Sequence, residues 1–390
     1  MGYTIQRSAT FNNLCALVIL FPVFFSFVFA MIGIPVPSYL AIIVIFTIIG
    51  TLLVNRLFTF SADWLKIVMA LLFLWILGSI SYTNSVIASK EKFISIVYNT
   101  VLPIFMIELF FLSSEKKQIN LLDLEKKFLL YSYCLIWFAF FAFLLFRVRD
   151  ETGRYSIPGL NNPIWFSRFI GMLMIVLLYC EKPTNKNVVL YFSSILIALF
   201  LMFAGGSRGP LLAVIITYCF IKSYLVSKKK IILILTLIVL LILIGFKFVG
   251  GYLFETNFYS LSERVNLVGL FSSLKFDYLK GNGIGSYSIS FFGKDVVQYP
   301  HNVFLELFIE NGIIGVLIFI VVMGIFFKKF QPNIITFLCF FYFLSSLPSG
   351  DIPGNNNLYI LLYLSIYARG NTLIYYHGSR GSEPPQLLAA

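Results

Sequence analysis

Apolar runs long enough to cross a lipid bilayer recur along this chain from residue 12 to residue 369, and they limit the folds open to it. Inside lipid, only helices and closed barrels satisfy their own backbone polar groups. Barrel strands would alternate apolar and polar residues, whereas these runs are continuous. Charged residues make up only 12% of the chain, against about 25% in soluble proteins. We therefore predict an all-α, polytopic membrane protein with a single transmembrane domain over residues 1–376.

The apolar runs predict about twelve transmembrane helices. They cover residues 12–31, 38–54, 64–83, 93–112, 128–146, 163–180, 187–204, 210–226, 231–249, 303–327, 333–347 and 356–369. The end of the chain, residues 377–390, carries neither an apolar run nor a periodic pattern. We interpret it as a disordered tail or a segment added to the native chain.

The basic residues predict how these helices are oriented, because lysine and arginine favour the cytoplasmic side. With both termini cytoplasmic, the inner segments are rich in lysine, and the long outer loops cover residues 147–162 and 250–302. The net charge of +12 lies mostly in short loops between spans, so it does not predict a nucleic-acid partner. The outer side carries six arginines, whose forked side chains suit phosphate better than lysine does: Arg147, Arg149, Arg154, Arg168, Arg208 and Arg264. Pairing with outer acids is the alternative interpretation of each.

Three of these arginines stand at positions that the sequence pattern singles out. Arg208 follows Ser207 at the predicted start of a helix, whose free N–H groups attract negative charge. Arg168 enters the helix that starts at Asn162 and Pro163, at a depth where a charge usually faces a polar cavity. Arg264 lies in residues 258–279, whose apolar spacing predicts an amphipathic helix in the long outer loop. Binding of lipid headgroups is the simpler alternative for Arg208 and Arg264.

Two shorter patterns lie between this loop helix and the next span. Residues 281–287, GNGIGSY, predict a flexible turn, and no strand precedes them as a dinucleotide site would need. The segment YPHNVFLELFIENGIIG then begins a helix in which His301 shares a face with Gly312 and Gly315. Those glycines would let a neighbouring helix approach closely. The two glutamates of the segment, Glu306 and Glu310, fall on the other side, and no HExxH sequence is present, so no metal site is predicted.

The segment resembles the signature of the O-antigen ligase and Wzy-type O-antigen polymerase superfamily. The signature is matched by His301, Asn302, nine further residues, Gly312, two residues and Gly315. The Ser-Arg-Gly sequence around Arg208, the GxG turns and the long late loop also look like this family, and the resemblance covers most of residues 150–330. The N-terminal third matches in hydropathy only.

The resemblance implies a GT-C-like helical fold and a metal-independent, inverting glycosyltransferase without a cofactor. Its substrates would be glycans on undecaprenyl diphosphate, at the periplasmic face of the bacterial inner membrane. His301 would act on the acceptor hydroxyl, supported by Asn302, Gly312 and Gly315. Arg208 and Arg264 would hold the diphosphate, and Arg168 is a third candidate for that role from its position alone. An imidazole with an ordinary pKa of about 6.5 can serve as a base at neutral pH.

Three readings of the function stay open on the sequence. The first is a polymerase that joins lipid-linked repeat units, with membrane lipids and a chain-length regulator as further candidate partners. The second is a ligase that passes the glycan to lipid A–core, and a protein O-oligosaccharyltransferase is a smaller variant of it. The third is a flippase or transporter of lipid-linked glycans. A transporter would place charges along a central pathway, whereas here most predicted spans have apolar centres.

Overall fold

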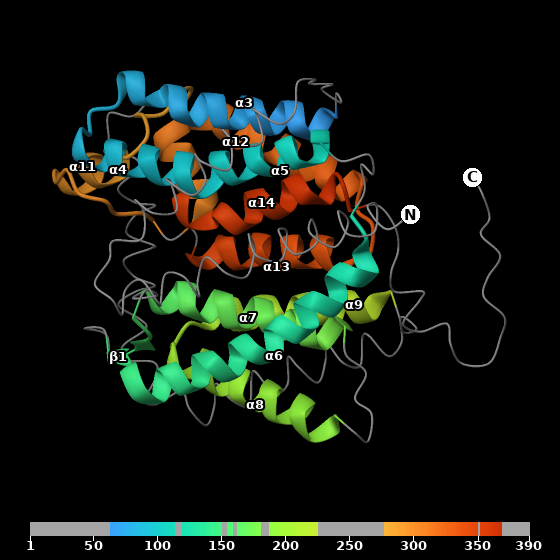
Figure 1. Cartoon of the computed structure of the whole chain (residues 1–390). Helices are drawn as coiled ribbons and strands as arrows, with labels where there is room; N and C mark the ends of the chain where they lie inside the picture. Colours follow the sequence, from blue (N-terminus) through green and yellow to red (C-terminus); the bar gives the residue numbers. More distant parts are fainter. Residues whose placement is uncertain are drawn as a thin grey trace.

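The computed structural model describes residues 63–113, 119–149, 154–158, 162–180, 187–224, 277–300, 302–349 and 352–368. The predicted spans 12–31, 38–54 and 231–249, nearly all of the predicted loop helix, and the tail lie outside these residues. The described part is a bundle of helices that run roughly parallel or antiparallel to one another (Figure 1).

The bundle has eight long helical segments and several short ones within the described residues. The long ones are α3 (Trp64–Gly78, extended by η1, Ser79–Tyr82), the segment α4–η2–α5 (Ile87–Ile96, Val97–Val101 and Leu102–Ser113), α6 (Leu121–Phe146), α7 (Pro163–Cys180), α8 (Val188–Ala204), α9 (Arg208–Ser223), α12 (Val303–Lys328) and α13 (Ile334–Ser349). The short ones are α11 (Ser286–Phe292), η4 (Pro353–Asn355) and α14 (Asn356–Ser365). Every predicted span that falls on described residues contains one of these helices.

Among the described residues, four helices are long and apolar enough to cross a membrane: Trp64–Tyr82, Leu121–Phe146, Pro163–Cys180 and Val303–Lys328. Val188–Ala204 and Ile334–Pro348 are shorter apolar helices. The described part of the chain is therefore mostly helical and holds four candidate membrane spans, which is consistent with a membrane protein.

A small hairpin departs from the all-α prediction. β1 (Val148–Arg149) follows α6 directly and pairs antiparallel with β2 (Tyr155–Ser156), with Arg149 opposite Tyr155. Two residues per strand give almost no periodic signal, so the sequence predicted only an outer loop here.

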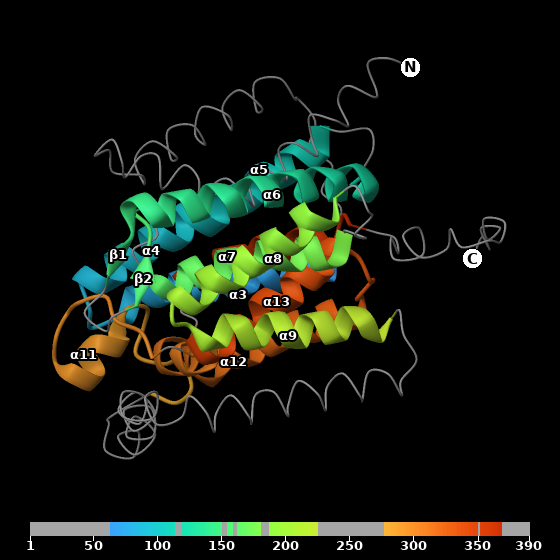
Figure 2. The same ribbon diagram turned by 90° about the horizontal axis from the view of Figure 1, so that it is seen from below.

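α7 lies in the middle of the bundle, between α6 and α8 on one side and α9 and α13 on the other (Figures 1 and 2). Almost all of its residues are buried. Its Gly171 permits the close approach, because a Cβ there would lie 2.8 Å from Phe341 of α13 and 3.1 Å from Val214 of α9. This central helix begins at the end of the bundle where α12 also begins, which we call the motif end.

Polar contacts join different helical segments at each end of the bundle. At the end opposite the motif, Lys329 pairs with Asp63 at 2.9 Å, and the N–H of Ile119 donates to the carbonyl of Tyr367. At the motif end, the N–H of Ile352 donates to Glu306. These contacts join segments that are far apart in the sequence at both ends of the bundle.

Candidate functional site

The helix that follows the histidine motif is broken at Gly312. This residue has φ 66° and ψ −170°, a conformation that side-chain-bearing residues rarely adopt, in the middle of α12. The predicted continuous helical face is therefore broken between Gly312 and Gly315, and His301, the third residue of that face, lies outside the described residues. The break resets the direction of the side chains beyond Gly312.

The backbone groups freed by the break are taken up by the loop at residues 277–283. The N–H groups of Ile313 and Ile314 donate to the carbonyls of Tyr278 and Leu279. In return, the N–H groups of Asn282 and Gly283 donate to the carbonyls of Ile309 and Glu310. Trp75 of α3 donates from its indole nitrogen to the carbonyl of Asn311, at 2.9 Å. Buried backbone polar groups need such partners, so the loop and the broken helix form one unit.

Close approach to Gly312 is made by this loop and not by a neighbouring helix. A Cβ on Gly312 would lie 2.2 Å from the carbonyl oxygen of Leu279, and a Cβ on Gly281 would lie 2.5 Å from the backbone nitrogen of Asn311. Both positions require glycine. The prediction of a helix–helix contact at Gly312 is thus replaced by a contact between loop and helix.

The GNGIGSY segment is a tightly packed loop rather than the flexible turn that its glycines predicted. Gly283 and Gly285 have φ values of 89° and 78°, and each would place a Cβ within 2.6 Å or less of backbone in the α3–α4 corner. Ile284 between them is fully buried, and its N–H and C=O bond with the hydroxyls of Ser79 and Thr83. The glycines here allow close packing, which the sequence alone does not distinguish from flexibility.

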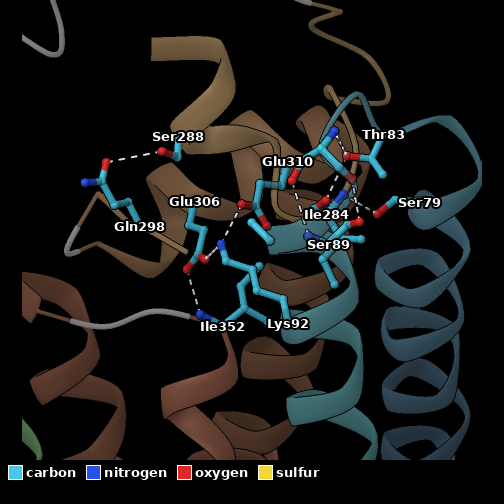
Figure 3. A network of polar contacts seen from close by, with 12 residues as sticks. Ser79, Thr83, Ser89, Lys92, Ile284, Ser288, Gln298, Glu306, Glu310 and Ile352 are labelled. Atoms are coloured by element: carbon cyan, nitrogen blue, oxygen red, sulfur yellow. Dashed lines mark hydrogen bonds and ion pairs between the residues drawn. The ribbon is translucent and has the colours of Figure 1, made fainter. Parts of the chain in front are cut away.

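Beneath the loop, Lys92 of α4 lies between two glutamates of α12 (Figure 3). Its ammonium group is 2.5 Å from Glu306 and 2.6 Å from Glu310, and all three side chains are at most 1% exposed. The other oxygen of Glu306 accepts the N–H of Ile352 at 2.6 Å. This ionic cluster links α4, the first two turns of α12 and the residue that precedes η4. Among the described residues, neither glutamate belongs to a group of three or more acids, histidines or cysteines that could hold a metal ion.

The segment after α11 is also fastened to α4 by Asp295, which acts as a cap from a distant part of the sequence. Its carboxylate accepts the hydroxyl of Ser85 and the N–H groups of Val86, Ile87 and Ala88, at 2.6 to 3.1 Å. The Ile87 N–H, followed by the Ser85 hydroxyl and the other N–H groups, holds the pKa of Asp295 well below its usual range. N–H groups at the start of a helix have no partner within the helix, and they therefore favour the charged form of a nearby carboxylate.

The residues next to the motif histidine reach the start of the central helix. His301 itself lies outside the described residues. Two positions before it, the hydroxyl of Tyr299 accepts the side-chain amide of Asn162 at 3.0 Å. Asn162 also caps α7 as predicted, accepting the N–H of Ile164 at 2.9 Å. One position after it, Asn302 caps α12 by accepting the N–H of Leu305.

The turn between α8 and α9 packs against the same helix start. A Cβ on Gly205 would lie 2.4 Å from the hydroxyl oxygen of Ser167, in the second turn of α7. Arg208 begins α9 two residues after Gly206 and is exposed. The predicted cap Ser207 occupies its position but makes no capping hydrogen bond. Arg208 is therefore brought towards the helix start that Tyr299 contacts.

Arg154 is a second arginine at this turn, and the sequence reasoning did not assign it to the site. Its side-chain carbons would lie 2.8 Å and 3.0 Å from a Cβ on Gly206, which has φ 60°. It is half-buried and comes from the hairpin after α6. Only the missing side chain at Gly206 makes room for it, a signal that is not readable before the fold is known.

Arg168 lies deeper, inside the bundle. Its side chain is 2% exposed, and it donates to the carbonyl of Ser345 at 2.9 Å and to the side-chain oxygen of Asn355 at 3.2 Å. It therefore joins α7 to α13 and η4. Arg264, the third predicted anion-binding arginine, lies outside the described residues.

A second buried ionic cluster lies at the opposite end of the bundle. Lys66 donates to both oxygens of Glu108, at 2.7 Å and 2.8 Å, and Tyr363 and Tyr367 also donate to Glu108. Lys66 is therefore buried in an ion pair. With Arg168 and Lys92, these residues show that the described helices bury charges as well as apolar side chains.

The pairing of Lys92 with Glu306 and Glu310 was the main feature that sequence reasoning missed. The spacing of the two glutamates, four residues apart in an apolar helix, is a signal that a buried cation faces them. The spacing does not say which of the chain's lysines or arginines provides that cation.

No protein-family model matches this chain, and no curated protein sequence matches it.

Proposed function

We propose that this protein is a membrane glycosyltransferase that polymerises oligosaccharide repeat units carried on undecaprenyl diphosphate. The observation that carries the proposal is the contact between Tyr299, two residues before His301, and Asn162, which caps α7. The α8–α9 turn that precedes Arg208 packs on the same end of α7. A base and a phosphate-binding arginine that are far apart in sequence would then serve one reaction.

The chemistry proposed for this end is displacement at the anomeric carbon of the lipid-linked sugar. The acceptor hydroxyl attacks that carbon, the bond from the carbon to the diphosphate oxygen breaks, and the lipid diphosphate leaves with the electron pair. His301 takes the proton of the hydroxyl. Arg208 stabilises the growing charge on the diphosphate through its forked N–H groups. Attack from the opposite face inverts the anomeric configuration.

The broken helix would hold the motif in place for this reaction. Asn302 caps α12, and the Lys92 cluster fixes the next two turns. Gly312 lets the outer loop dock into the helix below them. In this proposal the protein has about twelve spans in a GT-C-like arrangement in the bacterial inner membrane, with its active site at the periplasmic face. The working partners are the lipid-linked donor and a glycan acceptor.

A ligase that transfers the same glycan to lipid A–core is the alternative within this chemistry. Both reactions use a lipid diphosphate as the leaving group, and they differ only in the acceptor. They are separated by incubating the purified protein with the lipid-linked repeat unit, with and without lipid A–core, in EDTA. Long lipid-linked chains indicate the polymerase, and glycan attached to lipid A–core indicates the ligase.

A transporter of lipid-linked glycans is the second candidate, and two observations favour it. α12 is a discontinuous helix, as in many transporters, and charged side chains are buried within the described bundle. Reconstituted vesicles would distinguish it from a transferase. Movement of the lipid-linked repeat unit across the bilayer without new glycosidic bonds would support the transporter and contradict the transferase.

A further inference from the structure

Two arginines at the end of α6 are held against a single tyrosine ring. The guanidinium carbons of Arg147 and Arg149 lie 5.7 Å and 5.8 Å from the centre of the Tyr155 ring. Both arginines are exposed. A guanidinium packed on a ring keeps N–H groups at its edge for a further partner. Two like charges brought to one ring therefore present a site for an anion.

The Tyr155 ring packs against the bundle, so the two arginines lie on a supported surface. Tyr155 lies opposite Arg149 in the hairpin register. Its ring meets the edge of Phe143 of α6, with centroids 6.0 Å apart. Phe143 is buried and packs against Phe166 of α7. The platform beneath the two arginines thus belongs to the core of the bundle.

The arginines stand at a border between polar and apolar surface. Arg147 directly follows α6, a candidate membrane span whose last two turns expose Phe141, Leu144 and Leu145. The last residues of α8 lie beside them, since Phe200 packs on Phe143, and Phe200 and Phe203 are also exposed. Arginines at the end of an apolar span lie at the depth of lipid headgroups.

We propose that Arg147 and Arg149, held on Tyr155, bind the phosphate of a membrane lipid whose hydrocarbon chain lies on the exposed ends of α6 and α8. A negatively charged ligand is favoured, because the segment RVRDETGR at residues 147–154 carries three arginines against two acids. The apolar surface below the arginines favours a lipid over a free phosphate. This site uses arginines other than Arg208 and needs no transfer reaction to exist.

Binding to the purified full-length protein in a neutral detergent tests this site. The probes are dioleoylphosphatidylglycerol, undecaprenyl diphosphate and inorganic diphosphate. The double substitution Arg147→Ala/Arg149→Ala should weaken binding of a lipid probe at least about tenfold, since it removes charge-assisted hydrogen bonds. Lys280→Ala is the matched control, because Lys280 is also a cation held over a tyrosine ring at the motif end, 5.0 Å from Tyr82. An unchanged melting temperature verifies that each variant is folded.

The probes also identify the source of the phosphate. If undecaprenyl diphosphate binds more tightly than phosphatidylglycerol, the site exists and its ligand is a lipid-linked substrate. If the two lipids bind equally, the site exists and its ligand is the bulk phospholipid. Inorganic diphosphate bound as tightly as the lipids would contradict the apolar part of the site. Lipid binding by the double variant that equals binding by the Lys280→Ala control would overturn the proposal.

Discussion

The ammonium group of Lys92 lies 2.5 Å from a carboxylate oxygen of Glu306, in the interior of the bundle where both side chains are almost completely buried. The same ammonium group is shared with Glu310. One lysine thus joins the helix of the α3–α4 corner to the first two turns of the helix that follows the motif histidine. The position of those turns depends on this buried charge.

Replacing Lys92 by Met should strongly destabilise the protein, because it leaves two carboxylates buried without a cation. Loss of one partner from a buried ion pair costs about 3–5 kcal/mol. Lys280→Met, at an exposed lysine of the same end, should stay within about 0.5 kcal/mol of the wild type. The free energy of unfolding in mixed detergent micelles measures both. Equal stabilities for the two variants would contradict a structural role for the cluster.

A compensating variant separates lost charge balance from lost packing. Lys92→Met combined with Glu306→Gln and Glu310→Gln removes all three charges and keeps the volumes similar. This triple variant should recover most of the stability lost in Lys92→Met alone, since neutral replacement of a whole buried cluster is often tolerated. A triple variant as unstable as Lys92→Met would show that packing, and not charge, explains the loss.

Gly312→Ala should prevent the loop at residues 277–283 from docking into the broken helix. The new Cβ would lie 2.2 Å from the carbonyl oxygen of Leu279, at a residue with φ 66°. Strain at such a position and the clash together should cost at least about 2 kcal/mol. Gly324→Ala in the same helix is the control, because a Cβ there meets no atom within 4 Å. Thermal unfolding compares the two, and similar melting temperatures would contradict the break at Gly312.

The cap that Asp295 provides should depend on pH. Because the N–H of Ile87 and the other donors lower its pKa in the folded protein, the cap contributes stability above the ordinary carboxyl pKa of about 3.9. That contribution should be lost as the pH falls through the lowered folded-state pKa. The protection of the amides at residues 86–88, meaning their hydrogen-exchange rate relative to the intrinsic rate at the same pH, should therefore fall in acid in the wild type.

Asp295→Asn removes the carboxylate and is the matched test of that pH dependence. In this variant, the amides at residues 86–88 should exchange faster at neutral pH, and acid should change their protection less than in the wild type. Amides in the middle of α7, which do not contact Asp295, serve as the internal reference. The same acid response in both proteins would rule out Asp295 as the titrating cap.

Arg168 and Arg208 should respond differently to replacement by lysine. Arg168→Lys should lower the free energy of unfolding by about 2–3 kcal/mol, because buried hydrogen bonds from its charged group to Ser345 and Asn355 are lost or misaligned. Arg208→Lys should leave the stability unchanged and slow glycan transfer roughly ten- to hundredfold, since lysine lacks the fork. Unfolding and transfer assays on both variants check this contrast. Full transfer activity in Arg208→Lys would contradict a diphosphate-binding role.

The positions of the helices could be predicted from the sequence because each apolar run is bounded by readable signals. Asn162 and Pro163 mark the start of α7, and both lie where predicted. The apolar run of α4–α5 was more difficult, since the helix begins at Ile87 and carries Lys92 inside it. A lysine near the end of a run usually marks the end of a span, and only its pairing with Glu306 and Glu310 allows it to be buried.

The connections between distant segments could not be predicted in the same way. Gly312 looked like a small residue for helix packing, yet its partner is the carbonyl of Leu279 in a loop. Asp295 caps a helix about 200 residues earlier in the chain, and no local pattern reveals that. Such contacts depend on which ends of the bundle meet, and helix periodicity carries no information about that.

Glycan transfer by the purified protein is the most direct test of the proposed function. Wild-type protein is incubated with the lipid-linked repeat unit, and the products are separated by length, alongside His301→Ala at equal concentration and equal melting temperature. The proposal predicts long lipid-linked chains with the wild type and at least about a hundredfold less product with the variant. Chains of normal length and amount from His301→Ala, or no new glycosidic bond from the wild type, would contradict it.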